Sequence, residues 1–142
     1  MLGGEHYSLS VTEGDYRLMG WMHLRKDFDS DTNISEDRAK EIAFRFLEKH
    51  APDLLDTVEV RWIQATIKVP VNPPHDEGFI LQDGTIITGM RVKLWDNLSK
   101  KYAWVIVGAN EQIISFERDV VWNTQKHCRT TERWLHDDWL QL

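Results

Sequence analysis

The sequence contains very little cysteine, which limits the chemistry open to it. Cys128 is the single cysteine among 142 residues, so no disulfide can form within one chain. Such usage fits a reducing compartment, because structural disulfides belong to oxidising ones. The first residues also lack the basic start and apolar run of a secretory signal peptide. We therefore expect a cytoplasmic protein.

Long apolar runs and an excess of basic residues are lacking as well. No stretch approaches the about 20 consecutive apolar residues that a membrane-spanning helix needs. The net charge is −6, from 23 acids against 17 Lys and Arg. Binding to nucleic acid requires a basic footprint that displaces counterions from phosphates, and anionic membranes attract basic segments. We expect neither as a partner, whereas a basic protein partner is compatible with this charge.

The common catalytic motifs are missing from the sequence. It contains no GxSxG, HExxH, GxGxxG or phosphate-binding P-loop. These absences remove the easily recognised hydrolases, kinases and dinucleotide enzymes, but an enzyme without a motif stays open. No cofactor is expected.

Tryptophan is the one residue type in clear excess. Such large rings either fill a core or anchor a partner at an interface. The seven tryptophans are Trp21, Trp62, Trp95, Trp104, Trp122, Trp134 and Trp139.

The segment 34–52 is the clearest helix. Ser35 is a typical N-cap residue, and the two acids after it suit the positive end of the helix dipole. Pro52 is expected to end the helix. The apolar residues recur at the spacing of one buried stripe, formed by Ala39, Ile42, Ala43, Phe46 and Leu47.

Most of the remaining chain has the alternation of β-strands joined in hairpins. In 57–69 the apolar face switches near Trp62–Ile63, which a bulge would explain, as would a change of packing partner or burial of both faces. Asp83-Gly84 is a strong hairpin signal. The expected strands and hairpins cover residues 6–26 (two strands around Glu13-Gly14-Asp15), 57–69, 79–88 (two short strands), 90–95, 101–108 and 113–122.

This order of elements predicts an α+β fold in a single domain, residues 1–142. Hairpins dominate, and only one helix lies between strands, which favours an antiparallel sheet. We expect about six to eight strands, with the helix packed on one face and a second helix at the C-terminus, capped by Thr130 or Thr131.

The C-terminal stretch KHCRTTERWLHDDWLQL allows three interpretations. The favoured one is structural: Leu135, Trp139 and Leu142 share one helical face that would dock on the sheet. The second is a zinc site formed by His127, Cys128, Glu132 and His136, although adjacent His and Cys is not a usual ligand spacing.

The third interpretation of this stretch makes Cys128 a nucleophile. A thiolate needs a nearby base or positive charge. His127 is a poor base because neighbouring side chains of an extended segment point in opposite directions. The base would then come from His23, His50 or His136.

Two segments resemble the PepSY-type small α+β domains. ISEDRAKEIAFRFLEKHAP, residues 34–52, is similar to the leading helix of that family. YAWVIVGANEQIISFERD, residues 102–119, is similar to its closing hairpin, although the turn reads GANEQ where the family often has Asp-Gly. The resemblance implies a non-catalytic module that binds or restrains another protein, and it supplies no catalytic residues.

The leading hypothesis is a small, non-enzymatic binding or inhibitor module. Its surface would be the sheet face or edge that the helix leaves uncovered, with Trp21, Trp95 and Trp104 as anchors. The partner would be another protein, or a second copy that pairs through an edge strand. The alternative is a small-molecule-binding or hydrolytic enzyme with a pocket between sheet and helix.

Overall fold

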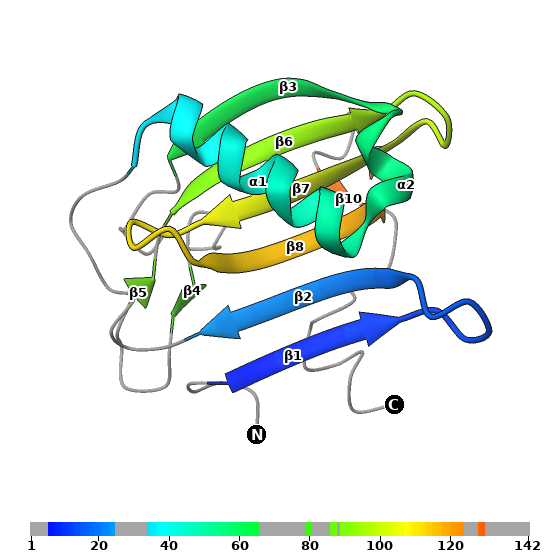
Figure 1. The fold of residues 1–142 in the computed structure, drawn as a ribbon, viewed down its shortest axis with the longest axis horizontal. Coiled ribbons are helices and arrows are strands. Elements are labelled where there is room, and N and C mark those ends of the chain that lie inside the picture. The colour runs from blue at the N-terminus through cyan, green and yellow to red at the C-terminus, as the bar shows by residue number, and fades with distance from the viewer. Residues whose placement is uncertain are drawn as a thin grey trace.

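The computed structural model of the chain describes residues 6–24, 34–65, 79–80, 86–87, 89–123 and 128–129. Its centre is an antiparallel sheet with the strand order β1-β2-β8-β7-β6-β3, and helices cover one face (Figure 1). The α+β class and the antiparallel sheet were both predicted, and six strands fall within the expected six to eight. The C-terminal helix expected after Thr130 lies outside the described residues. The six strands are β1 (His6–Val11), β2 (Leu18–Leu24), β3 (Val58–Ala65), β6 (Met90–Asp96), β7 (Lys101–Val107) and β8 (Ile113–Val120).

Two short strand pairs accompany the main sheet. β4 (Phe79–Ile80) pairs with β5 (Ile86–Ile87), which confirms the hairpin predicted around Asp83-Gly84. β9 (Trp122–Asn123) pairs with β10 (Cys128–Arg129). The prediction of a single strand over 113–122 is therefore wrong at its C-terminal end, because β8 ends at Val120 and Trp122 belongs to β9. Asp119 has a φ of 56°, in the left-handed region, and the register of β7 with β8 shifts there.

Helix α1 (Glu36–His50) begins as the sequence predicts. The hydroxyl of Ser35 accepts a hydrogen bond of 3.1 Å from the backbone N–H of Arg38, which makes Ser35 the N-cap. Pro52 lies just after the end of α1 and is also the first residue of a second short helix, α2 (Pro52–Leu55). Proline suits the first turn of a helix, where its missing N–H has no intrahelical partner to lose.

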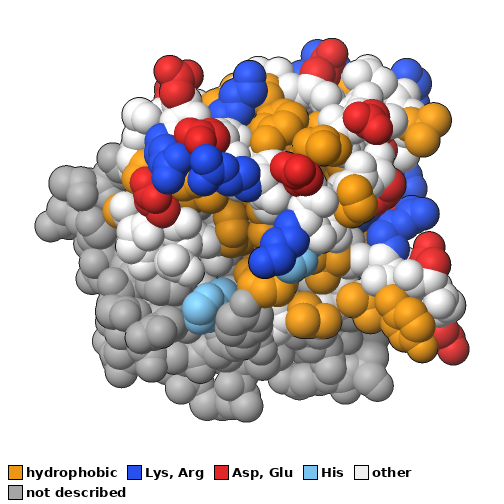
Figure 2. All heavy atoms as spheres, in the orientation of Figure 1, with side chains coloured by type: hydrophobic (Ala, Val, Ile, Leu, Met, Phe, Trp, Pro, Cys, Tyr) orange, Lys and Arg blue, Asp and Glu red, His pale blue; other side chains and the backbone are white. Residues whose placement is uncertain are grey.

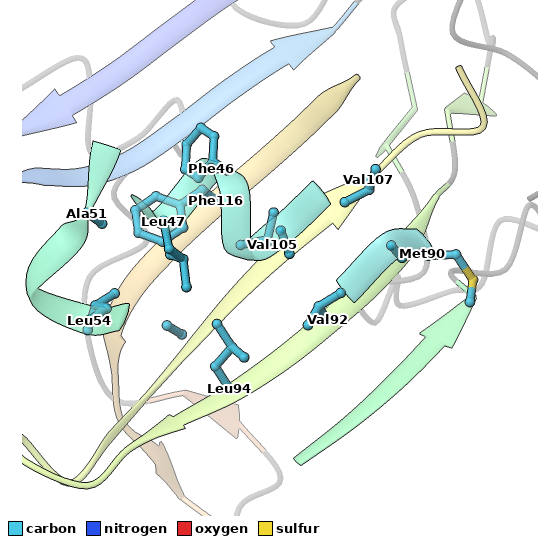
Figure 3. Close-up of a cluster of buried hydrophobic side chains, with 13 residues drawn as sticks. Phe46, Leu47, Ala51, Leu54, Met90, Val92, Leu94, Val105, Val107 and Phe116 are labelled. Atoms are coloured by element: carbon cyan, nitrogen blue, oxygen red, sulfur yellow. The ribbon is translucent and has the colours of Figure 1, made fainter. Parts of the chain in front are cut away.

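The core lies between α1 and the sheet (Figure 3). The stripe predicted for the helix supplies Ala39, Ala43, Phe46 and Leu47, all buried. Close packing of this kind fills the space between the layers with side chains. The sheet's contribution to the cluster is Met90, Val92, Leu94, Ala103, Val105, Val107 and Phe116.

A bulge in β3 explains the switch of apolar face seen in the sequence. Val60 is opposite Leu94, but Trp62 is opposite Lys93, so Arg61 is the extra residue between them. One extra residue reverses the alternation. Val60 and Ile63 consequently both pack against the core, although their positions differ in parity. The bulge alternative is confirmed.

An ion pair ties α2 to the sheet. Arg118 of β8 has a side chain that is only 3% exposed, and it donates two hydrogen bonds of 3.0 and 2.7 Å to the carboxylate of Asp53. Asp119 lies 3.4 Å from the Nε of Arg118. The buried cation is therefore compensated by two acids, as a charge removed from water requires.

Candidate functional site

The candidate site lies on the sheet face turned away from α1. Strand β6 has a strict alternation of burial, because successive side chains point to opposite faces. Met90, Val92 and Leu94 are buried in the core, whereas Arg91, Lys93 and Trp95 are only half-buried.

The neighbouring strands add aromatic rings to the same face. Across the β6–β7 ladder, Trp95 is opposite Tyr102 and Lys93 is opposite Trp104. The bulge in β3 places Trp62 beside Lys93. We call this surface the cation–aromatic face, and its members are Arg61, Trp62, Arg91, Lys93, Trp95, Tyr102 and Trp104.

Lys93 occupies the centre of the face. Its ammonium nitrogen lies 4.5 Å from the centroid of the Tyr102 ring and 5.1 Å from that of Trp62. Both distances fall within the range in which a ring quadrupole attracts a cation. The two rings therefore hold the positive charge of Lys93 over the middle of the sheet.

Arg61 is the exposed member of the face, and it lies over the half-buried Trp95. The guanidinium carbon of Arg61 lies 5.4 Å from the centroid of the Trp95 ring. Trp95 and Tyr102 meet edge to face, with centroids 4.8 Å apart and an interplanar angle of 64°. Arg61 also reaches the carboxylate of Glu59 at 3.3 Å. This partly exposed group of aromatic rings with arginine has the composition typical of binding hot spots.

Trp104 belongs to the same face. The sequence analysis expected it to be an exposed anchor, but it is buried. It is only 7% exposed. The guanidinium carbon of Arg91 lies 5.9 Å from its ring and 5.9 Å from that of Trp62. Trp104 is therefore the buried tryptophan of the cation–aromatic face, and Trp62 and Trp95 are its half-buried ones.

Trp21 lies on the opposite side of the sheet from the one expected. It pairs with Phe116, whose ring is in the core, and it packs against the core cluster. Its ring meets Phe46 of α1 edge to face, with centroids 5.7 Å apart. In residues 18–24, apolar side chains occur at both even and odd positions. The sequence therefore could not show which side of β2 faces the helix.

His50 stands beside this group at the end of α1. Its ring centroid lies 4.8 Å from that of Phe46 and 5.6 Å from that of Trp21. Partial burial lowers the pKa of His50 from its ordinary 6.5, and the charge of Lys49 adds to the effect. The folded state therefore favours the neutral imidazole of His50 more than the unfolded chain does.

The zinc and thiol interpretations of the C-terminal stretch fall largely outside the described residues. His127, Glu132 and His136 lie there, and Cys128 is described only as a backbone partner of Asn123 in β10. Among the residues that the structure describes, no three His, Cys, Asp or Glu side chains form a group able to hold a metal ion. Within the same ranges, neither helix combines the length and the apolar character that crossing a bilayer demands.

Comparison with known proteins found no family model, no curated protein and no solved structure that matches this chain. The segments that resemble PepSY-type domains form α1 and the β7–β8 hairpin. The resemblance itself stays a prediction.

The sequence analysis named only part of the cation–aromatic face. Trp62, Tyr102 and the three basic residues were missed. The signal for Lys93 and Arg91 was present in MRVKLWD, where basic and aromatic residues alternate with apolar ones. The position of Trp62 depends on the bulge, whose exact residue the sequence did not define.

Proposed function

We propose that this protein is a non-enzymatic binding module that recognises another protein through the cation–aromatic face. The observation that carries the proposal is the set of contacts between Arg61, Lys93, Trp95 and Tyr102 on the sheet face away from α1. Tryptophan, tyrosine and arginine dominate the energetics of protein interfaces. The rings are held in place by their neighbours, so little conformational entropy is lost when a partner binds.

Arg61, the exposed cation of the face, suits a partner that presents an acidic side chain at this point. Arg61, Arg91 and Lys93 lie close together here, although the whole chain carries a net charge of −6. Complementary charge steers the encounter and fixes the register of an interface. The basic partner suggested by net charge alone is replaced in this proposal by an acidic one.

The packing between α1 and the sheet also supports a surface site over an interior one. The alternative function, a small-molecule-binding or hydrolytic enzyme, needs a pocket between these two layers. In the described residues that space contains Phe46, Leu47, Val105 and Phe116, each at most 7% exposed. The binding proposal requires no space there.

A pair of charge reversals tests the proposal. Arg61→Glu changes the cation–aromatic face, and Arg45→Glu makes the same change on α1. The two arginines are matched, since both are exposed and each forms an ion pair with a glutamate of its own element, Glu59 or Glu41. Each variant and the wild type are used for affinity purification with quantitative mass spectrometry.

We expect at least one protein that the wild type and Arg45→Glu retain and that Arg61→Glu loses. Its binding should weaken as salt concentration rises, since exposed charges are screened. If all three forms retain the same proteins, the proposed face is not the binding surface. A small molecule that remains bound in native mass spectrometry, and equally in both variants, would favour the enzyme alternative.

A further inference from the structure

The two edges of the main sheet differ in how well they are protected. Exposed edge strands pair with other chains unless charges, bulges or proline prevent it. β3 has such protection, because it contains Glu59 and Arg61, and Arg61 forms a bulge. Among the described strands, β1 is the other edge of the six-stranded sheet, and its sequence HYSLSV has no acidic residue, lysine, arginine or proline.

The β1 edge also exposes apolar side chains. Leu9 is 52% exposed and Val11 is 46% exposed, both high values for aliphatic residues in a strand. Figure 2 shows hydrophobic side chains at the surface over the β1–β2 hairpin, whereas charged side chains follow α1. Helix α1 packs mainly over β6, β7 and β3 (Figure 1), and Phe46 near its end also meets Phe116 of β8 and Trp21 of β2. Burial of Leu9 and Val11 against another surface would be favourable.

We propose that β1 pairs in antiparallel fashion with β1 of a second copy of this chain, so that the two sheets become continuous. The inference goes beyond the proposed function, because it concerns a different edge of the molecule and a different partner. A two-fold axis between the strands would bring the same surface of each copy into contact, as in most homodimers.

The sequence of β1 is complementary to itself in this arrangement. Directly opposed residues of an antiparallel pair lie on the same face of the sheet. An axis at Leu9 puts Leu9 opposite Leu9 and Ser8 opposite Ser10. An axis at Ser10 puts Leu9 opposite Val11. In both registers apolar residues face apolar ones, and no charge of like sign is opposed within Tyr7–Val11.

The same self-pairing fails at the other edge. Two copies of β3 paired about Val60 would put Glu59 opposite Arg61, but the bulge at Arg61 interrupts the regular row of backbone groups that a pairing strand requires. The ladder of β1 with β2 also shifts register, between Ser10 and Val11, but there the extra residue is Met19 of β2 and not a residue of β1. The second copy is therefore assigned to β1.

The test is the mass of the protein in solution, measured by light scattering or sedimentation over about a hundredfold range of concentration. Leu9→Lys places a charge at the centre of the proposed contact. Leu98→Lys is the matched control, since Leu98 is 79% exposed in the turn after β6. We expect dimers for the wild type and for Leu98→Lys, and monomers for Leu9→Lys.

A wild type that remains monomeric over the whole range overturns the proposal, and so does a dimer that Leu9→Lys leaves intact. Circular dichroism checks that Leu9→Lys is folded. If it is not, Val11→Lys replaces it with the same expected loss of the dimer. Arg61→Glu, which tests the cation–aromatic face, should leave the dimer unchanged, so the two proposals fail separately.

Hydrogen exchange gives an independent reading of the same contact. Backbone amides of β1 should exchange more slowly at high protein concentration than at low concentration, whereas amides of β3 should show no such dependence. Concentration-dependent protection of β3 instead of β1 would show that the copies meet at the wrong edge for this proposal.

Discussion

Arg118, almost fully buried on β8, binds both carboxylate oxygens of Asp53 on α2. Only four residues form that helix, and it has no side-chain hydrogen bond at its N-cap. The ion pair therefore fixes α2 against the sheet. The carboxylate of Asp53 also neutralises part of the positive charge of Arg118, which is buried among apolar side chains.

Asp53→Asn should lower the free energy of unfolding by about 1–2 kcal/mol at neutral pH. Asparagine keeps the shape but removes the charge that Arg118 needs. The effect stays modest because the Asp53 side chain is 48% exposed to water and Asp119 remains near Arg118. Chemical denaturation measures it. Equal stability of the two forms would mean that Asp119 alone compensates Arg118.

The same pair predicts a dependence on pH. The guanidinium of Arg118 holds the pKa of the Asp53 carboxyl below its usual 3.8. The folded state therefore favours the carboxylate, and this stabilisation is complete above the ordinary pKa and is lost as pH falls through the lower, folded one. The difference between wild type and Asp53→Asn should shrink as the solution becomes more acidic than pH 3.8. A difference that grows there would contradict the assignment.

Neighbouring substitutions in β6 should have very different effects. Leu94 is fully buried, so Leu94→Ala should cost about 2–5 kcal/mol of stability. Lys93→Ala removes contacts with Tyr102 and Trp62 that are worth about 1 kcal/mol at a partly exposed site. Thermal unfolding of both variants compares them. Similar losses would mean that the face away from α1 is as tightly packed as the core.

Trp104→Ala should behave as a core substitution. The side chain is 7% exposed, and truncation of a buried aromatic residue costs about 3–5 kcal/mol. Any loss of partner binding should therefore accompany a lower melting temperature. Trp95→Ala is the comparison, because Trp95 is only half-buried and should lose binding with less loss of stability. A stable Trp104→Ala variant that binds nothing would instead make Trp104 a direct contact.

His50 should titrate below its ordinary pKa of 6.5. Burial against aromatic rings disfavours the imidazolium in the folded state. Stability is then greatest above the ordinary value and declines as pH falls from it towards the folded pKa, because the unfolded chain takes up the proton first. An NMR titration of the ring proton gives the midpoint directly. A midpoint at or above the ordinary value would rule out this environment.

Local features of the fold could be predicted well from the sequence. Ser35 and the apolar stripe of α1 depend on neighbours three and four residues away, and the alternation of β6 depends on neighbours two away. Such short-range patterns are complete within one segment. The helix, its cap, the hairpins and the bulge alternative were recognised for this reason.

Features that depend on distant segments could not be predicted in the same way. β2 pairs with β8, nearly a hundred residues later, and neither strand contains a sequence pattern that identifies its partner. The side of Trp21 follows from that pairing. The clustering of Arg61, Arg91 and Lys93 on one face was also hidden, because a net charge of −6 does not say where the basic residues lie.

The alternation of β6 has a consequence for how this protein can change over evolutionary time. Consecutive residues of this short strand are under different constraints. Val92 and Leu94 are buried in the core and maintain the fold, whereas Lys93 and Trp95 lie half-buried on the other face. Selection can therefore exchange the outward residues, and with them whatever the proposed binding face recognises, while the inward residues keep the scaffold intact.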